Sequence, residues 1–507
     1  MGQTWSCPAP GEPAKFLTRN SETTGSDEEA QWYLHLHSIK AEGKVVIVVI
    51  FNHALSNMME YTGIIGYALK IMGGYAMNRS FLHPRIQIAE IMDRIYRYGM
   101  TTTSGGNLSI LDDDGSIWIS PGGTDKGVME ARDVVRMRGE ERLEGGERPS
   151  VEYPFHRAVY AKRPDIRAVL HAHPPALVAF SVAGKTPDTR VIPQVWSVCG
   201  KVGFAPYALP GSEQLGRNIA AQFEAGCDIV VMENHGVVAS GSSLLDAFQR
   251  FETLEFCART IINASTLGGA IPLKEEQLGL FPKYRTVAAL EETVRCIPGS
   301  RELEIRDSAS RFVRRAYERR LMTSTEGILS ARLDDTDFVI TPFGMDRKNL
   351  GSDDLVAIRG GKREAGSRPS QASALHRKLY LDHPGLGSII SAQCPNVTAF
   401  IVSKLALDSR TIPESYANLR DVPIVPFHYQ FLDHDRVSAA LSARNPVLVL
   451  DGDCVLASGK TILEAYDRLE VAEATANALI AAQRLGGFKP IDQGAIDELV
   501  RAFNIPG

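Results

Sequence analysis

The sequence predicts an α/β protein that contains two copies of one domain. Its 507 residues exceed what one ordinary hydrophobic core accommodates, so two to four domains are expected. From about residue 85 onward, apolar strand-like segments alternate with segments of helical periodicity. Segments of the first half recur in the second half about 220 residues later, for example from Gly106 to Gly327. Such an internal repeat predicts two domains of the same fold.

The composition is that of a soluble globular protein, with 44% hydrophobic and 23% charged residues. A net charge of −5 is small for this length and indicates neither a nucleic-acid partner nor an acidic one. The seven cysteines are scattered and form no CxxC pair. An odd number of dispersed cysteines is typical of reduced thiols, so we expect a cytoplasmic protein.

Residues 1–84 are expected to form a partly disordered N-terminal extension. Residues 1–30 are rich in Ser, Thr, Glu, Gly and Pro, which suits a disordered tail. The first residues match the N-myristoylation pattern, with Gly2 as the acceptor. The apolar run Val45–Phe51 is much shorter than a membrane-spanning helix, and the segment around it has no clear period.

The first domain is predicted over residues 85–265, where helices and strands alternate. Its small-residue loops Thr101–Gly106 and Ser120–Gly123 flank one predicted hairpin and could bring backbone N–H groups together around an anion. Helices are expected over Ile86–Tyr98, from Ser150 to about Lys162, over Ala176–Ala183, from a start at Gly211–Glu213, and from Leu244 to about Ala264. Strands are expected directly before His171 and over Asp228–Met232.

Three histidines stand at the ends of predicted strands. His171 and His173 are one residue apart, so their side chains point to the same side of a strand. His235 follows the second buried strand, directly before a glycine. Ser150 is a suitable N-cap for the helix that starts nearby, and Glu152 falls where the helix dipole favours a carboxylate. These residues are candidates for a metal site with an adjacent base.

The ordered motifs GGN, SPGG, PSxE, HAHPP and ENHG resemble the class II aldolase/adducin superfamily, which includes L-fuculose-phosphate aldolase and L-ribulose-phosphate 4-epimerase. The resemblance covers about residues 86–265. It implies a three-layer α/β/α domain with a mostly antiparallel central sheet. It further implies one divalent metal per chain, usually Zn²⁺, held by His171, His173 and His235, with Glu152 as the acid/base. It also implies a substrate pocket, whose candidate residues are Gly106, Asn107, Gly122, Gly123 and Ser150.

The chemistry of these residues agrees with the resemblance. Three neutral imidazoles with an open fourth position form a catalytic metal site, although they do not fix the metal, and Fe²⁺, Mn²⁺ or Co²⁺ are alternatives. Such a cation polarises carbonyl and hydroxyl oxygens and stabilises an enediolate, while a nearby carboxylate moves the proton. Gly122 and Val151 replace hydroxyl residues of phosphate-binding relatives, which weakens the case for a phosphorylated substrate. Trp196-Ser197 stands where the aldolases of this family use a tyrosine, so the residues favour metal-dependent carbonyl chemistry in general over aldol cleavage specifically.

The second copy, predicted over residues 301–507, lacks the chemistry of the first. The candidate residues Asn107, Glu152, His171, His173 and His235 are replaced by Ile328, Ala372, Ser391, Gln393 and Asp453. These side chains would not form a comparable zinc site, whereas the apolar strands remain. We therefore expect a degenerate domain that keeps the fold and lacks the metal. Residues 266–300 are interpreted as a linker over the first domain, with a helical piece at Val287–Val294.

The predicted function is a metal-dependent class II aldolase-like lyase, of the aldehyde-lyase type, acting on a small sugar-like or sugar-phosphate-like hydroxy-carbonyl substrate. Alternatives on the same scaffold are a decarboxylase, an epimerase, a non-haem iron oxygenase or a non-catalytic adducin-like scaffold protein. A scaffold role predicts a degraded metal site in every copy, whereas residues 86–265 keep the complete set. The enzyme is therefore favoured. We also expect a homo-oligomer, a dimer of tandem chains that mimics a tetramer.

Overall fold

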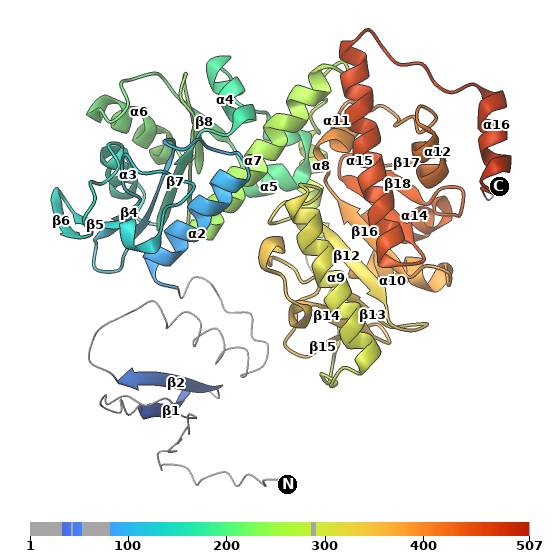
Figure 1. Ribbon diagram of the computed structural model, residues 1–507, viewed down its shortest axis with the longest axis horizontal. Helices are drawn as coiled ribbons and strands as arrows, with labels where there is room; N and C mark the ends of the chain where they lie inside the picture. The colour runs from blue at the N-terminus through green and yellow to red at the C-terminus, as the bar shows by residue number, and fades with distance from the viewer. Residues whose placement is uncertain (1–32, 42–43, 53–81, 285–289, 506–507) are drawn as a thin grey trace, which may run out of the picture. The chain divides into compact units, whose positions relative to one another are not determined.

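The computed structural model describes residues 33–41, 44–52, 82–284 and 290–505 (Figure 1). The chain divides into two compact units, Met1–Gly74 and Tyr75–Gly507. In the first unit, strands β1 (Tyr33–Ala41) and β2 (Lys44–Asn52) form an antiparallel hairpin. The apolar run Val45–Phe51, for which no period was expected, belongs to β2. The remainder of the extension, including Gly2, lies outside the described residues.

The first copy is built on an eight-stranded sheet in the order β6-β5-β4-β3-β7-β10-β9-β8. Every neighbouring pair is antiparallel except β8 and β9. The mostly antiparallel sheet is therefore confirmed. The strands are β3 (Asn107–Leu111), β4 (Ile117–Ile119), β5 (Val135–Arg138), β6 (Glu141–Glu144), β7 (Ala168–Ala172), β8 (Val202–Ala205), β9 (Ile229–Met232) and β10 (Val237–Gly241).

Helices cover both faces of this sheet, which confirms the three-layer α/β/α architecture. Alternate residues of β7 enter two different hydrophobic clusters: Leu170 packs on the face with one group of helices and Val169 on the other face. The helices of the Leu170 face are α2 (Pro84–Arg97), α4 (Pro175–Val182), α5 (Pro193–Cys199) and α7 (Leu244–Ser265). Those of the Val169 face are α3 (Tyr153–Lys162) and α6 (Glu213–Glu224).

The second copy repeats this architecture around a nine-stranded sheet in the order β11-β15-β14-β13-β12-β16-β19-β18-β17. Its register matches that of the first copy, because Asn107 pairs with His171 in one sheet and Ile328 pairs with Ser391 in the other. The strands are β11 (Glu292–Thr293), β12 (Ile328–Arg332), β13 (Phe338–Ile340), β14 (Val356–Arg359), β15 (Lys362–Glu364), β16 (Ser388–Ala392), β17 (Ile424–Val425), β18 (Val447–Leu450) and β19 (Cys454–Gly459).

The helices of the second copy follow the same order along the chain. They are α9 (Ser300–Glu318), α10 (Ser373–Asp382), α11 (Pro395–Val402), α12 (Pro413–Leu419), α13 (Tyr429–Leu432), α14 (His434–Ala440), α15 (Ile462–Arg484) and α16 (Gln493–Ala502). No helix among the described residues is both long and apolar enough to span a membrane.

Two local predictions were wrong. Helix α3 begins at Tyr153 with Glu152 as its N-cap, and Ser150 lies in the preceding turn. Pro154 has no backbone N–H, so it fits as the second residue of α3, where the N–H needs no partner within the helix, but not as the fourth residue after an N-cap at Ser150, where the N–H is needed. In the predicted linker, the described helix is α8 (Glu275–Tyr284), and Glu292–Thr293 forms a strand where part of a helix was expected.

A buried polar network joins the two copies. The guanidinium of Arg94, on α2, donates to both carboxylate oxygens of Asp346 at 2.7 and 2.8 Å. Arg94 Nε also donates to the hydroxyl of Tyr317 at 2.6 Å, and this hydroxyl donates to Glu252 at 2.6 Å. Since one hydrophobic cluster also contains buried residues of both copies, the copies share a continuous core.

Candidate metal centre

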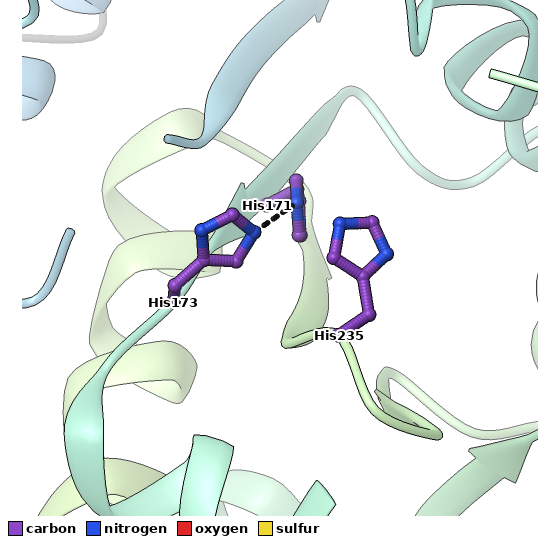
Figure 2. Close-up of side chains that lie close together, drawn as sticks. All are labelled: His171, His173 and His235. Atoms are coloured by element: carbon purple, nitrogen blue, oxygen red, sulfur yellow. Dashed lines mark hydrogen bonds between the residues drawn. The ribbon is translucent and has the colours of Figure 1, made fainter. Parts of the chain in front are cut away.

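Two chain segments bring the three histidines together. His171 lies in β7 and His173 directly follows the end of this strand, while His235 lies in the tight turn between β9 and β10 (Figure 2). The turn needs a left-handed residue, which Asn234 supplies with φ of +52°. Gly236 follows, and a Cβ there would lie 2.6 Å from His173 Cδ2. The close approach of the turn to His173 therefore depends on this glycine.

The imidazole nitrogens converge on one point. His171 Nε2 and His173 Nε2 are 3.1 Å apart, and the ligand atoms of all three histidines lie within 4.8 Å of one another. The ring centroids are 4.8 Å apart for His171 with each of the other two, and 5.2 Å apart for His173 and His235. The three predicted metal ligands therefore lie together in one cluster.

Burial favours the neutral form of His171 and His173. His171 is fully buried, which together with the neighbouring imidazoles holds its pKa well below the ordinary value. Burial also lowers the pKa of His173, and His235 lowers it further. His171 Nδ1 donates to the carbonyl of Val237 at 3.0 Å, so Nε2 of the neutral ring carries a lone pair. This tautomer is the one that binds a metal through Nε2.

Glu152 faces the same point. Its Oε2 lies 3.3 Å from His171 Nε2, and its Oε1 lies 3.5 Å from His235 Nε2. The carboxylate is buried and accepts a hydrogen bond of 2.7 Å from Asn107 Nδ2. The predicted base is therefore in contact with two of the three predicted ligands.

A chain of buried hydrogen bonds holds Asn107 in turn. His156 Nε2 donates to Asn107 Oδ1 at 2.5 Å, and His156 Nδ1 contacts the hydroxyl of Ser109 at 2.7 Å. Ser109 also contacts the hydroxyl of Tyr160 at 2.8 Å. Burial lowers the pKa of His156 to about 3, so its ring is neutral and donates through one nitrogen only. This chain fixes the orientation of the Asn107 amide, with its oxygen toward His156 and its nitrogen toward Glu152.

Sequence reasoning missed His156, Ser109 and Tyr160. The same three residue types recur in the second copy as Ser330, His376 and Tyr380, with hydrogen bonds of 2.8 Å from Ser330 to each of the other two. The repeat therefore carried a usable signal, namely buried polar residues kept in both copies. Only the first copy extends this chain to Asn107 and Glu152, because Ile328 and Ala372 stand at those positions in the second.

The site fits a divalent cation. With Nδ1 of His171 donating to Val237, neither His171 Nε2 nor the Glu152 carboxylate has a proton to share across their 3.3 Å contact. Oε1 of Glu152 is buried and has no hydrogen-bond partner. A cation bound between these atoms would relieve the unfavourable contact and the missing partner of Oε1, because the lone pairs would coordinate it and its charge would compensate the buried carboxylate. The 3.1 Å between the two nitrogens also suits tetrahedral coordination with bonds of about 2.0–2.1 Å.

The other predicted pocket residues differ in how directly they contact the histidines and Glu152. Gly106 has φ of +79°, and a Cβ there would lie 2.8 Å from the carbonyl of His171. Ser150 is buried, and its hydroxyl accepts the Glu152 backbone N–H at 3.3 Å. Gly122 and Gly123 belong to the neighbouring loop, where the backbone N–H of Gly122 donates to the carbonyl of Arg148 at 3.0 Å. A Cβ on Gly123 would meet nothing within 4 Å. Asn107 holds Glu152 and His156 with both ends of its amide, which is a different role from the expected substrate contact.

The corresponding place in the second copy is a small cavity of about 50 Å³. Asp453, which replaces His235, is buried there, and burial raises its pKa. Its carboxylate accepts hydrogen bonds from Gln194 of the first copy and, at 3.0 Å, from Gln430. The one histidine cluster with metal-ligand spacing among the described residues is the one in the first copy.

The family model for the class II aldolase and adducin N-terminal domain matches residues 86–262 and again residues 309–480. The two matches together cover more than half of the chain. The protein therefore belongs to the class II aldolase/adducin family and contains two copies of its domain.

Relatives within this family are metabolic enzymes by name. The 3-oxo-tetronate 4-phosphate decarboxylase of Haemophilus influenzae is 33% identical over 168 residues, which are 32% of this chain and 80% of the relative. The L-fuculose phosphate aldolase of Methanocaldococcus jannaschii is 30% identical over 183 residues, or 35% of this chain and 95% of the relative. A solved L-fuculose 1-phosphate aldolase structure is 28% identical with a TM-score of 0.37, covering 40% of this chain and 97% of that one.

Proposed function

We propose that this protein is a metal-dependent lyase that cleaves a carbon–carbon bond in a small hydroxy-carbonyl substrate. The observation that carries this proposal is the fixed position of Glu152 against three converging imidazoles. His171, His173 and His235 would hold the metal, for which Zn²⁺ is the first candidate and Fe²⁺, Mn²⁺ or Co²⁺ the alternatives. When bound, a divalent metal supplies a Lewis acid that favours negative charge on a substrate oxygen.

Glu152 is proposed to move the proton. Carbon–carbon cleavage next to a carbonyl group leaves an electron pair on carbon, and that carbon must then receive a proton. In the aldol direction the same group removes a proton from carbon. Glu152 is buried, and Asn107 orients one of its oxygens, so Oε1 is the atom left to exchange a proton. Asn107 and His156 are positioning residues in this scheme.

A decarboxylase is the second candidate, because several relatives carry that name at 30–33% identity. Loss of CO₂ from a 3-oxo acid also leaves an electron pair next to a carbonyl group. Both reactions therefore require the same two groups, a cation near the carbonyl oxygen and a proton donor near the carbon. The bond that breaks, to CO₂ or to an aldehyde carbon, distinguishes the two.

Two measurements test the proposal. The first is the metal content of the purified protein beside that of a His171→Ala, His173→Ala variant, with one divalent ion per chain expected in the wild type only. The second is turnover with ketose 1-phosphates, 3-oxo acid phosphates and their unphosphorylated forms, followed by aldehyde and CO₂ release. Glu152→Gln should keep the metal and lose about 10²–10⁴-fold in turnover. A wild-type protein without metal, or a Glu152→Gln variant with full turnover, would contradict the proposal.

A further inference from the structure

The second copy keeps a cavity at the position where the first copy has its histidines. The cavity of about 50 Å³ lies beside the end of β16, where Ser391 and Gln393 stand, and beside the turn between β18 and β19, which contains Asp453. Ala372 lines it in place of the base of the first copy. With neither the histidines nor the base, this cavity has no role in the lyase reaction proposed for the first copy.

Amide side chains form most of the polar lining of this cavity. Gln194 reaches it from α5 of the first copy, Gln371 precedes α10, Gln393 follows β16, and Gln430 lies in α13. The Nε2 groups of Gln194 and Gln430 donate to the two carboxylate oxygens of Asp453, the second of these at 3.0 Å. A buried carboxylate and the glutamines around it therefore occupy the position of the first copy's ligands.

Three of these glutamines have an amide oxygen without a hydrogen-bond partner. They are Gln194, Gln371 and Gln430, and Oε1 is buried in each. In the part of the chain that the structure describes, no other buried side-chain amide oxygen lacks a partner, so all such oxygens belong to residues that line this one cavity. A buried acceptor without a donor costs folding free energy, and three together indicate a site for a ligand that supplies donors.

Reversing the amides would not satisfy these oxygens. Gln194 and Gln430 both face the carboxylate of Asp453, which accepts N–H groups and repels carbonyl oxygens while it is ionised. Each of the two amides must therefore turn its nitrogen toward Asp453 and its oxygen away from it. The donors for these oxygens have to come from a bound molecule.

The charges around the cavity disfavour an anionic ligand. The charged residues that line it are Glu326 and Asp453, and the lining residues that the structure describes include no Lys, Arg or His. Arg347 interacts with Glu326, but its guanidinium donates to the carbonyls of Gly327 and Met345. Burial raises the pKa of Asp453, because its negative charge is poorly compensated by neutral amides. A positively charged ligand would supply that compensation.

We propose that this cavity binds a small primary ammonium ion with a short aliphatic body. An ammonium group has three N–H donors and one positive charge, which match three unpartnered amide oxygens near one buried carboxylate. It leaves both hydrogen bonds of Asp453 intact, whereas a metal ion bound through Asp453 would compete with the amide N–H groups.

The rest of the lining suits the body of such a ligand. Ile328, Leu375 and Leu450 give the cavity an apolar side that can contact an aliphatic chain. With about 10–15 Å³ needed for each water-sized group, the cavity accommodates roughly 3–5 non-hydrogen atoms. Because Gln194 belongs to the first copy, the ligand would contact both copies. The inference concerns the second copy and does not rest on the proposed lyase activity.

Calorimetric titration of the full-length protein with n-propylammonium chloride tests the site. One ion should bind per chain, both in the wild type and in the His171→Ala, His173→Ala variant, which excludes coordination of the amine at the metal centre. n-Propanol has a similar shape without the charge, and tetramethylammonium has the charge without N–H groups, so each should bind at least about 10-fold more weakly. No saturable binding of n-propylammonium, or equal affinity for n-propanol, would overturn the proposal. Tighter binding of Ca²⁺ than of n-propylammonium would overturn the choice of an ammonium ion.

Gln371→Met tests whether the ligand binds in this cavity. Methionine keeps the length of the side chain and removes the amide, and Gln371 takes no part in the hydrogen bonds of Asp453. The affinity for n-propylammonium should fall about 10-fold or more, whereas the melting temperature of the ligand-free protein should not fall, because a buried oxygen without a partner has been removed. A purely structural role of Gln371 would lower the melting temperature instead. Gln483→Met, on the exposed side of α15, is the matched control and should change neither quantity. Wild-type affinity in Gln371→Met would overturn the proposal.

Discussion

Replacing Asn107 with isoleucine gives the first copy the residue that the second copy has at this position. Asn107 is buried and 3% exposed, and its amide makes hydrogen bonds of 2.7 Å to Glu152 and 2.5 Å to His156. The substitution removes both bonds without opening a large cavity. It leaves a ring N–H of His156 and an oxygen of Glu152 without these partners inside the domain.

The expected cost can be worked out from these two groups. A buried polar group without a partner costs about 1–3 kcal/mol, and the apolar isoleucine side chain offsets part of the total. A net loss of about 2 kcal/mol lowers the melting temperature of a domain of this size by about 4–8 °C. Turnover should fall about 10²-fold, because Glu152 keeps its charge but loses the donor that orients it.

The assay compares Asn107→Ile with the reverse change in the second copy, Ile328→Asn. Thermal unfolding followed by circular dichroism should show the loss for Asn107→Ile, and metal analysis should still find the ion, since no ligand has changed. Ile328→Asn gives His376 a possible partner and touches neither Glu152 nor the histidines, so turnover should be unchanged. An Asn107→Ile variant with wild-type stability and wild-type turnover would refute the positioning role of Asn107.

Three further outcomes are expected. Gly236→Ala should weaken metal binding about 10–100-fold, because its Cβ would lie 2.6 Å from His173 Cδ2 and 2.7 Å from the carbonyl oxygen of Ala172, so a ligand and the end of its strand must shift. Equilibrium dialysis would measure this, and wild-type affinity would contradict it. Arg94→Ala should destabilise the protein by about 3–5 kcal/mol in denaturant unfolding, because Asp346 stays buried without its cation, whereas Arg97→Ala on the surface should cost under about 1 kcal/mol. Gly2→Ala should abolish incorporation of labelled myristate in a competent cell extract, and no labelling of the wild type would contradict the N-terminal motif.

The sequence was most informative where periodicity and spacing act locally. The alternation of faces along a strand placed His171 and His173 on one side, and the structure brings His235 to them from a second strand end. The predicted helix start at Ser150 is wrong, because the capping preference of serine competes with the requirement that Pro154, which lacks an N–H, lie at one of the first positions of the helix. The hydrogen bonds of His156 join it to Asn107 and Ser109, which lie 49 and 47 positions earlier in the chain, and no local pattern reveals such contacts.

The interface between the copies was also beyond the sequence alone. Arg94 lies in a helix, and Asp346 lies in a loop 252 positions later. The two side chains form a buried ion pair only once both domains have folded. Helix α8 shows the same limit. Its apolar residues Leu278 and Phe281 pack on Phe427 and Phe431 of the second copy, and without that partner the sequence predicts only a partly structured linker over residues 266–300.

The position of the third ligand shows why the second copy keeps the fold without the chemistry. A buried carboxylate such as Asp453 needs donors, and Gln194 from the other copy and Gln430 supply them. At the equivalent position of the first copy, the candidate metal site requires lone pairs that face a cation, and His235 and the Glu152 carboxylate lie there. The two solutions exclude each other, because the amide that satisfies Asp453 would present an N–H to a metal ligand. The second copy therefore uses this position to bind the first copy, whereas the first copy keeps a histidine there as part of its candidate metal site.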